Sequence, residues 1–283
     1  MTEKHFCLDD SPSFQMIELD SVTSTNDFLR SYHPVVPKRM ILVTAEFQTA
    51  GRGAGSNHWE SAKGKNLMFS LLTHPTHLAA SEMFVLSEIM ALALSQALND
   101  FLPDIAKERQ NGNGQRFTIK WPNDIYYGNQ KICGMLIENE LMGRQVRDCV
   151  MGVGVNINQT QFESDAPNPC SLARILGHEV ERRFVLERVM QYFTKLYDQT
   201  EQNRSVETGH IAFEDIHQKY LDCLYRKGEA HTYRDKDGEF IATLTDVEPS
   251  GHLILTDERG NKRRYAFKEV QWSPFHNGQN PPS

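Results

Sequence analysis

The sequence has little of what marks a secreted, membrane-spanning or nucleic-acid-binding protein. Its five cysteines lie far apart and form no C-x-x-C pair, which favours reduced thiols over disulfides or structural zinc (Cys7, Cys133, Cys149, Cys170 and Cys223). No run of about 18 apolar residues is present to cross a bilayer, and residues 1–13 lack the apolar core of a signal peptide. A formal net charge of -7 argues against a general nucleic-acid binder. We therefore expect a cytoplasmic protein that binds neither membrane nor nucleic acid.

Several familiar nucleotide-binding and catalytic motifs are also missing. No G-x-x-x-x-G-K-[ST] sequence occurs, which excludes the P-loop. The Gly51-Arg52-Gly53 segment lacks the third glycine of a Rossmann fingerprint at the required offset. Signatures of protein kinases and of serine hydrolases are absent as well. Any nucleotide or carboxylate site must therefore be built in another way.

At 283 residues, with 39% apolar and 24% charged residues, the chain is long enough for one large domain and a small one. Residues 14–224 mix long helical patterns with strands, and we expect one domain there. After Tyr225, short alternating strands are separated by turn signals, which predicts a small β-barrel over residues 225–273. Residues 1–13 are expected to be a flexible leader and residues 274–283 a disordered tail.

Patterns of hydrophobicity predict the elements of the larger part of the chain. Strands are expected at 14–19, 40–47, 67–73, 117–121, 124–127, 131–140 and 149–157. Helices are expected at 81–101, 184–202 and 211–224, and another should begin at Ser24 or Thr25, either of which can cap it. Capping alone explains these hydroxyls, but a helix start also leaves hydroxyls and backbone N–H groups available to a polar ligand.

The most informative stretch is the glycine-rich segment between the second and third expected strands, residues 44–66. Gly51, Gly53 and Gly55 alternate around Arg52, and Trp59 follows. Glycines allow the backbone to approach a ligand closely, and the planar guanidinium suits phosphate or carboxylate. A mobile surface loop is the alternative interpretation.

A second informative stretch begins with the sequence KWPND. Lys120, Asn123, Asp124 and Lys131 all lie within a few residues of expected strand ends, around a hairpin signal at Gly128-Asn129. A solvated charge at a strand end remains the alternative for Lys131. Two fixed cations, Arg52 and Lys131, together with polar side chains, suit a phosphorylated or carboxylated small molecule.

Residues 149–157 form the third such stretch, CVMGVGVNI. Gly152 and Gly154 alternate with valines, so one face of this strand carries no side chains, and Asn156 continues that face. Glycines weaken a strand and often mark the close approach of a ligand or of another backbone segment.

Together these residues resemble the biotin protein ligases. The resemblance is carried by STN (24–26), QTAGRG (48–53), KWPND (120–124), K-x-x-G (131–134), GVGVN (152–156) and the C-terminal GHLILTDERGNKRRYAFKEVQW, and it runs from about residue 15 to 272. It implies an α+β fold, with a class II synthetase-like catalytic domain over 14–224 and an SH3-like barrel over 225–273. The catalytic domain would have a mixed or antiparallel sheet flanked by helices.

The resemblance also implies a reaction. The biotin carboxylate would attack the α-phosphorus of ATP, giving biotinyl-AMP and pyrophosphate. A lysine of a biotin carboxyl carrier protein or domain would then take the acyl group. Arg52 and Lys131 would hold the reacting oxygens, and Asp124 would orient Mg²⁺ or receive a proton from the lysine amine. The implied biotin contacts are Ser24, Thr25, Asn26, Gln48, Gly51, Arg52, Lys131 and Gly134, and the nucleotide contacts are Trp59, Lys120, Asn123 and Asn156.

Two departures from the family pattern carry expectations. Many relatives have a second basic residue where this chain has Ala54, so we expect weaker retention of biotinyl-AMP. About 13 residues before the first strand are too few for a winged helix, so we expect a short form without repressor activity. A homodimer is possible. The rival readings are a lipoate ligase or octanoyltransferase, and a non-catalytic sensor or nucleic-acid adaptor.

Overall fold

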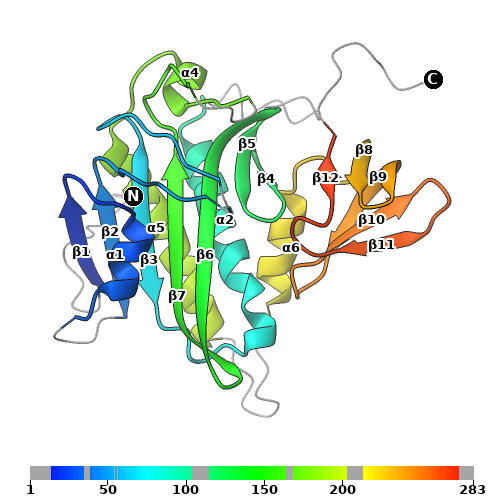
Figure 1. The fold of residues 1–283 in the computed structure, drawn as a ribbon, viewed down its shortest axis with the longest axis horizontal. Coiled ribbons are helices and arrows are strands. Elements are labelled where there is room, and N and C mark those ends of the chain that lie inside the picture. The colour runs from blue at the N-terminus through cyan, green and yellow to red at the C-terminus, as the bar shows by residue number, and fades with distance from the viewer. Residues whose placement is uncertain are drawn as a thin grey trace, which may run out of the picture.

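The computed structural model describes residues 14–34, 39–53, 55, 57–103, 115–163, 168–202 and 213–273. The expected leader, the expected tail and Ala54 lie outside these residues. Two sheets and the helices around them make up the described part of the chain (Figure 1).

The larger sheet has seven strands in the order β1-β2-β3-β7-β6-β5-β4. They are β1 (Phe14–Leu19), β2 (Met40–Ala45), β3 (Leu67–Thr73), β4 (Phe117–Lys120), β5 (Asp124–Tyr127), β6 (Gln130–Met142) and β7 (Gln145–Val155). β1 and β2 are parallel, and every other pair is antiparallel. The predicted α+β fold with a mixed sheet is therefore confirmed.

Helices cover the two faces of this sheet unequally. α2 (Phe84–Asp100) and α5 (Arg182–Gln202) pack against each other behind the sheet, with α6 (Glu214–Asp222) beside them (Figure 1). These helices bury the large apolar core on that face. α1 (Thr25–Ser31) lies on the other face and buries only a small cluster, formed by Leu29, Ile41, Val43, Leu72 and Val150.

The α2 helix is rich in apolar residues. With the short 3₁₀ helix η1 (Ala80–Glu82) before it, the segment is long and apolar enough to cross a membrane by length and composition alone. It lies inside the protein, however, and 67% of its apolar window is buried. The apolar surface of α2 is therefore that of a core helix.

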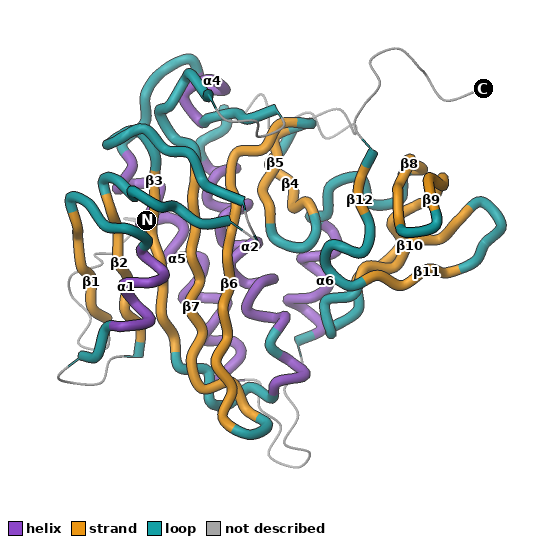
Figure 2. Tube along the Cα trace, in the orientation of Figure 1, coloured by secondary structure: helices purple, strands orange, loops and turns teal. Residues whose placement is uncertain are grey.

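The alternation of strand side chains leaves part of the front face bare. In β6 and β7, Cys133, Met135, Val153 and Val155 point into the core behind the sheet. Their neighbours in sequence consequently face the α1 side, and several of these neighbours are glycines. The connection between β2 and β3 crosses this face in front of β7 (Figure 2).

The C-terminal segment forms a separate antiparallel sheet in the order β11-β10-β9-β8-β12. Its strands are β8 (Ala230–Asp235), β9 (Gly238–Val247), β10 (Leu253–Asp257), β11 (Lys262–Tyr265) and β12 (Gln271–Trp272). The indole N–H of Trp121 donates to the carbonyl of Gly251 at 3.0 Å, and Phe267 packs edge-on against the same ring. The KWPND segment thus connects the two sheets.

One helix was not predicted, α4 (Leu172–Leu176). Its cues are present in the sequence, since the Ser171 hydroxyl caps it and Gly177 ends it with a left-handed φ of 80°. Helix α1 begins after Ser24, whose hydroxyl accepts from the N–H of Asp27, so Ser24 rather than Thr25 is the cap.

Candidate functional site

A cavity of about 930 Å³ opens on the α1 face of the large sheet. Its walls come from the start of α1, the β2–β3 connection, the β4–β5 turn, strands β6 and β7, and the C-terminal segment 267–272. It brings together every predicted site residue except Gly51: Ser24, Thr25, Asn26, Gln48, Arg52, Trp59, Lys120, Asn123, Asp124, Lys131, Gly134 and Asn156. Gly51 is buried beside it, where a Cβ would meet the Trp59 carbonyl oxygen at 2.9 Å.

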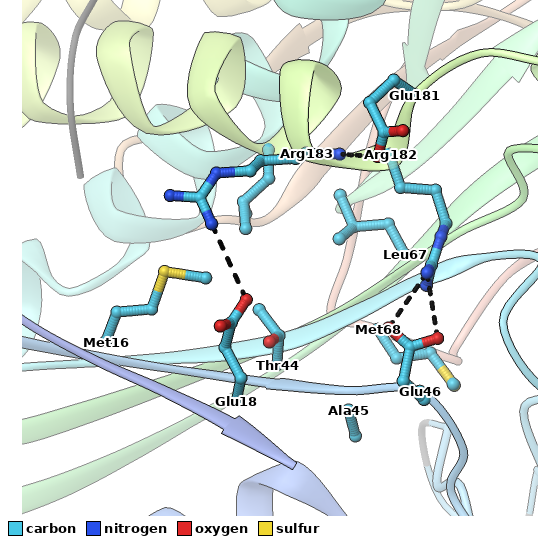
Figure 3. A pocket seen from close by; sticks show the side chains of 11 residues that line it. Met16, Glu18, Thr44, Ala45, Glu46, Leu67, Met68, Glu181, Arg182 and Arg183 are labelled. Carbon is cyan, nitrogen blue, oxygen red and sulfur yellow. Dashed lines mark hydrogen bonds and ion pairs between the residues drawn. The ribbon is translucent and has the colours of Figure 1, made fainter. Parts of the chain in front are cut away.

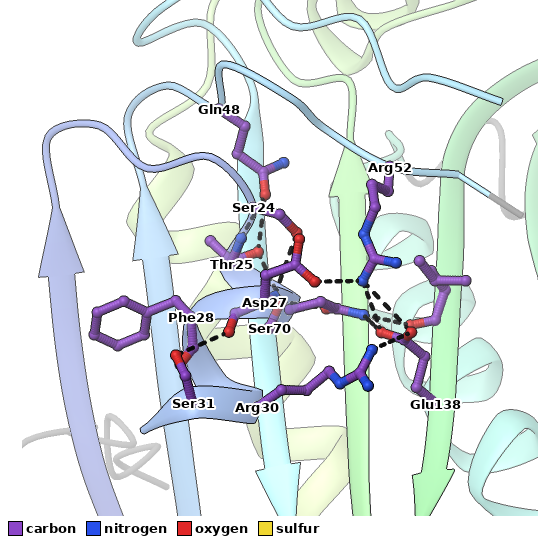
Figure 4. Close-up of polar contacts among 12 residues, drawn as sticks. Ser24, Thr25, Asp27, Phe28, Arg30, Ser31, Gln48, Arg52, Ser70 and Glu138 are labelled. Carbon is purple, nitrogen blue, oxygen red and sulfur yellow. Dashed lines mark hydrogen bonds and ion pairs between the residues drawn. The ribbon is translucent and has the colours of Figure 1, made fainter. Parts of the chain in front are cut away.

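Arg52 is held at the cavity wall by two carboxylates that the sequence did not indicate. Its Nη2 lies 2.8 Å from Asp27 Oδ1 and 3.1 Å from Glu138 Oε2 (Figure 4). Glu138 also accepts from Arg30 and from the amide of Asn26. With 36% of its side chain exposed, Arg52 keeps a solvent-facing edge on which an anionic ligand can bind.

Lys131 reaches the cavity from the first residues of β6. Its Nζ lies 2.6 Å from Asp124 Oδ2, so the β4–β5 turn and β6 present a cation and a carboxylate side by side. Both side chains are about one-quarter exposed. The backbone of Lys131 is fixed by hydrogen bonds with Asn168 and Cys170, which limits its movement.

The polar residues at the start of α1 form one network over β3. The Gln48 Oε1 accepts from the backbone N–H of Thr25 at 2.8 Å and from its hydroxyl at 3.1 Å. The Ser70 hydroxyl lies 2.7 Å from Thr25 Oγ1 and donates to Asn26 Oδ1 at 2.6 Å. This network fixes Gln48, and the NH₂ group of its amide has no partner among the described residues.

Side chains of the protein occupy part of the space above the strand glycines. A Cβ on Gly152 would collide with the side chain of Asn26, and a Cβ on Gly154 would collide with the Trp59 indole. Gly134 lies under the other end of that indole, at 3.0 Å. The glycines therefore allow Asn26 and Trp59 to lie flat on the sheet and form the floor of the cavity.

Two buried polar atoms of the cavity have no hydrogen-bond partner among the described residues: Trp59 Nε1 and Asn156 Oδ1. Buried polar groups are nearly always paired, so an unpaired donor and an unpaired acceptor in one cavity indicate the polar edge of a ligand. A heteroaromatic base that both donates and accepts hydrogen bonds fits this pair.

Lys120 lies among aromatic rings in the wall of the cavity. Its Nζ donates to the Tyr126 hydroxyl at 3.2 Å and lies 4.8 Å and 5.6 Å from the ring centres of Tyr126 and Trp272. Burial lowers the pKa of Lys120, and burial likewise raises the pKa of Tyr126 well above its ordinary value. The β12 strand of the C-terminal sheet thus contributes directly to the cavity.

The residues of the cavity fit a magnesium ion that arrives with a nucleotide. Within the described ranges, no cluster of three or more His, Cys, Asp or Glu side chains could hold a metal ion by itself. Asp124 offers one carboxylate beside Asn123. Mg²⁺ commonly takes one or two protein carboxylates, with the remaining ligands from substrate phosphates and water. Asp124 would hold such an ion while also facing Lys131.

A smaller pocket, of about 200 Å³, lies between β1, β2 and the start of α5 (Figure 3). Its guanidinium groups are engaged: Arg182 pairs with Glu46 at 2.9 Å and donates to the Asn66 carbonyl, and Arg183 lies 3.9 Å from Glu18. These contacts fasten α5 to the edge of the sheet, and the larger cavity is the candidate functional site.

Comparisons with known proteins match this arrangement. Residues 18–156 match the model of the Biotin/lipoate A/B protein ligase family. The Biotin--[acetyl-CoA-carboxylase] ligase of Paracoccus denitrificans is 29% identical over 226 residues, covering 78% of this chain and 85% of that protein. The Bifunctional ligase/repressor BirA of Bacillus spizizenii is 27% identical over 231 residues, covering 80% of this chain. The matched region spans 64% of the length of that relative.

A solved structure shares the fold. The biotin protein ligase of Aquifex aeolicus in complex with biotin and ATP superposes with a TM-score of 0.71 at 22% identity, covering 92% of this chain and 99% of that one. At this identity, the likeness concerns the fold.

Proposed function

We propose that this chain is a member of the biotin/lipoate A/B protein ligase family and an ATP-dependent biotin protein ligase. It joins biotin to AMP with release of pyrophosphate and then transfers biotin to a lysine of a carboxylase carrier domain. The observation that carries the proposal is that Arg52 and Lys131, from separate segments, line one cavity large enough for both substrates.

The first step brings two anions together. A biotin carboxylate oxygen attacks the α-phosphorus of MgATP, the bond from that phosphorus to the bridging oxygen breaks, and pyrophosphate leaves. Repulsion between the reactants and charge on the phosphoryl oxygens must be offset by fixed cations, which Arg52 and Lys131 provide. When the substrates bind, each cation turns from its present carboxylate partners to the substrate oxygens, or contacts both at once.

The neutral ends of the two substrates bind on either side of this centre. Ser24, Thr25 and the free NH₂ group of Gln48 offer donors and acceptors to the ureido ring of biotin. Asn156 Oδ1 accepts from the amino group of adenine, while the face of the Trp59 indole stacks against the base. The unpaired Asn156 Oδ1 supports this assignment.

In the second step, the amine of a carrier lysine attacks the acyl carbon of biotinyl-AMP and AMP leaves. The amine must lose a proton, and Asp124 is the carboxylate at the cavity wall that can receive it. The resulting amide links biotin to the carrier.

The proposal is tested by incubating the chain with biotin, MgATP and a biotin carboxyl carrier domain, and by weighing the carrier. A mass increase that corresponds to one biotin, together with pyrophosphate release that requires biotin, is the expected result. The same assay with lipoate and octanoate tests the rival family branch. Transfer of lipoate, with no transfer of biotin, would overturn the proposal.

A further inference from the structure

Lys268 adopts a backbone conformation that its side chain disfavours. It lies between β11 and β12 with a φ of 72°, in the left-handed region that favours glycine. Non-glycine residues persist in this region when surrounding contacts enforce it, and such residues gather at functional sites. The observed backbone therefore raises the question of what the lysine side chain does there.

The side chain of Lys268 lines the candidate cavity and reaches the glycine-rich loop. Lys268 is one of the residues that line it, and its Nζ lies so near Gly55 that a Cβ on that glycine would collide with it. The same Nζ is 5.7 Å from the ring centre of Phe267. The lysine thus connects the C-terminal sheet to the glycine-rich loop that carries Arg52.

Among the described residues Lys268 forms no ion pair with a carboxylate, and the same holds for Lys120, whose Nζ contacts the Tyr126 hydroxyl instead. The positive charge that Lys268 adds is therefore uncompensated. A cavity that must admit a carboxylate and a polyphosphate requires such an excess.

We infer that Lys268 is a phosphate-contacting residue, whose ammonium binds the triphosphate of the nucleotide at the wall of the cavity. This inference rests on the proposed function, since it assigns a further contact to the same site. As the bond to the α-phosphorus breaks, negative charge moves to the departing pyrophosphate, and the lysine offsets that charge. The C-terminal sheet then contributes to adenylation directly through this ammonium.

The test uses the full chain and four variants. Lys268→Gly removes the ammonium and relieves the backbone, so it separates charge from folding. Lys268→Ala removes the charge, and Lys268→Arg retains it. Lys262→Ala is the control, because Lys262 is a lysine of β11 that does not line the cavity. Each protein is measured for thermal unfolding, for the ATP dissociation constant by calorimetry, and for biotin-dependent pyrophosphate release.

We expect Lys268→Gly to unfold no earlier than the wild type and to bind ATP roughly tenfold more weakly, as for a lost charge-assisted contact. Lys268→Ala should weaken ATP binding similarly, and Lys268→Arg should retain most of the affinity. The difference in ATP affinity between the wild type and Lys268→Ala should shrink as the salt concentration is raised, because the contact is exposed. Lys262→Ala should match the wild type.

Unchanged ATP affinity in Lys268→Gly would overturn the inference, as would an equal loss in Lys262→Ala. Failure of the proposed function can be distinguished from failure of this inference. A wild type that binds ATP but activates lipoate instead of biotin would refute biotin ligation. The calorimetry would still decide the role of Lys268. A wild type that does not bind ATP would refute both.

Discussion

Replacing Gly154 with alanine perturbs the floor of the cavity at one defined point. A Cβ at this position would overlap the Nε1 and Cε2 atoms of the Trp59 indole and would lie 2.8 Å from its Cδ2. Ordinary contacts begin at 3.4 Å, so the ring must retreat by more than half an ångström or leave the sheet. The backbone of Gly154 does not require glycine, since its φ is not positive.

The two responses have different costs. If the indole stays on the sheet, overpacking lowers the free energy of unfolding by about 1–3 kcal/mol. Alanine is more favourable than glycine within a strand, which offsets about 0.5–1 kcal/mol of this loss. If the indole swings away, stability is largely preserved, but the stacking surface that we propose for adenine is lost, which is worth about 1–3 kcal/mol per base. Gly154→Ala should therefore lower either the free energy of unfolding or the affinity for ATP by about 1–2 kcal/mol.

A double-mutant cycle identifies the cause. Urea unfolding and ATP calorimetry are measured for Gly154→Ala, Trp59→Ala and the double variant. Without the indole, the added methyl group has no ring to meet, so Gly154→Ala should then be neutral or slightly stabilising. Gly134→Ala should have a smaller effect than Gly154→Ala, because its Cβ would meet the indole only at 3.0 Å. An equal cost of Gly154→Ala in the presence and absence of Trp59 would refute the reasoning.

Three further outcomes follow. Arg52→Ala and Lys131→Ala should each lower biotin-dependent pyrophosphate release by on the order of 10² to 10³, measured at saturating substrates; a loss below tenfold in both would contradict their assignment. Asn156→Ala should raise the KM for ATP about tenfold with little change in the KM for biotin, because only the nucleotide loses a contact. His217 bonds to the buried Glu88 at 2.6 Å, which raises the pKa of His217, and burial raises the pKa of Glu88. The folded state thus holds more protons than the unfolded state, so the free energy of unfolding should fall as pH rises from about 6.5 through the higher pKa of folded His217, and His217→Gln should flatten this profile.

Much of the fold was predictable because strand and helix periods are local properties of the sequence. The alternation of valine and glycine in β7 predicted a bare face, and the structure shows which side chains lie on it. The convergence of Arg52 and Lys131 on one cavity agrees with their predicted association. Their roles, and the domain boundaries, stay predictions.

The partners of these cations could not be predicted, because they depend on packing between distant segments. Asp27 lies 25 residues before Arg52, and Glu138 lies 86 residues after it. The sequence pattern of segment 267–272 predicts only part of a barrel, and nothing local to it indicates that Lys268 and Trp272 reach a cavity formed by the larger sheet. The cytoplasmic location and the homodimer likewise stay predictions.

The most direct test is a crystal structure of the chain with biotin and a non-hydrolysable ATP analogue. The account predicts that biotin carboxylate or α-phosphate oxygens lie about 2.7–2.9 Å from both the Arg52 guanidinium and the Lys131 ammonium. The account would be contradicted by ligands bound elsewhere. It would also be contradicted by ligands bound in this cavity while Arg52 or Lys131 stays paired with its own carboxylates and out of reach of the ligand oxygens.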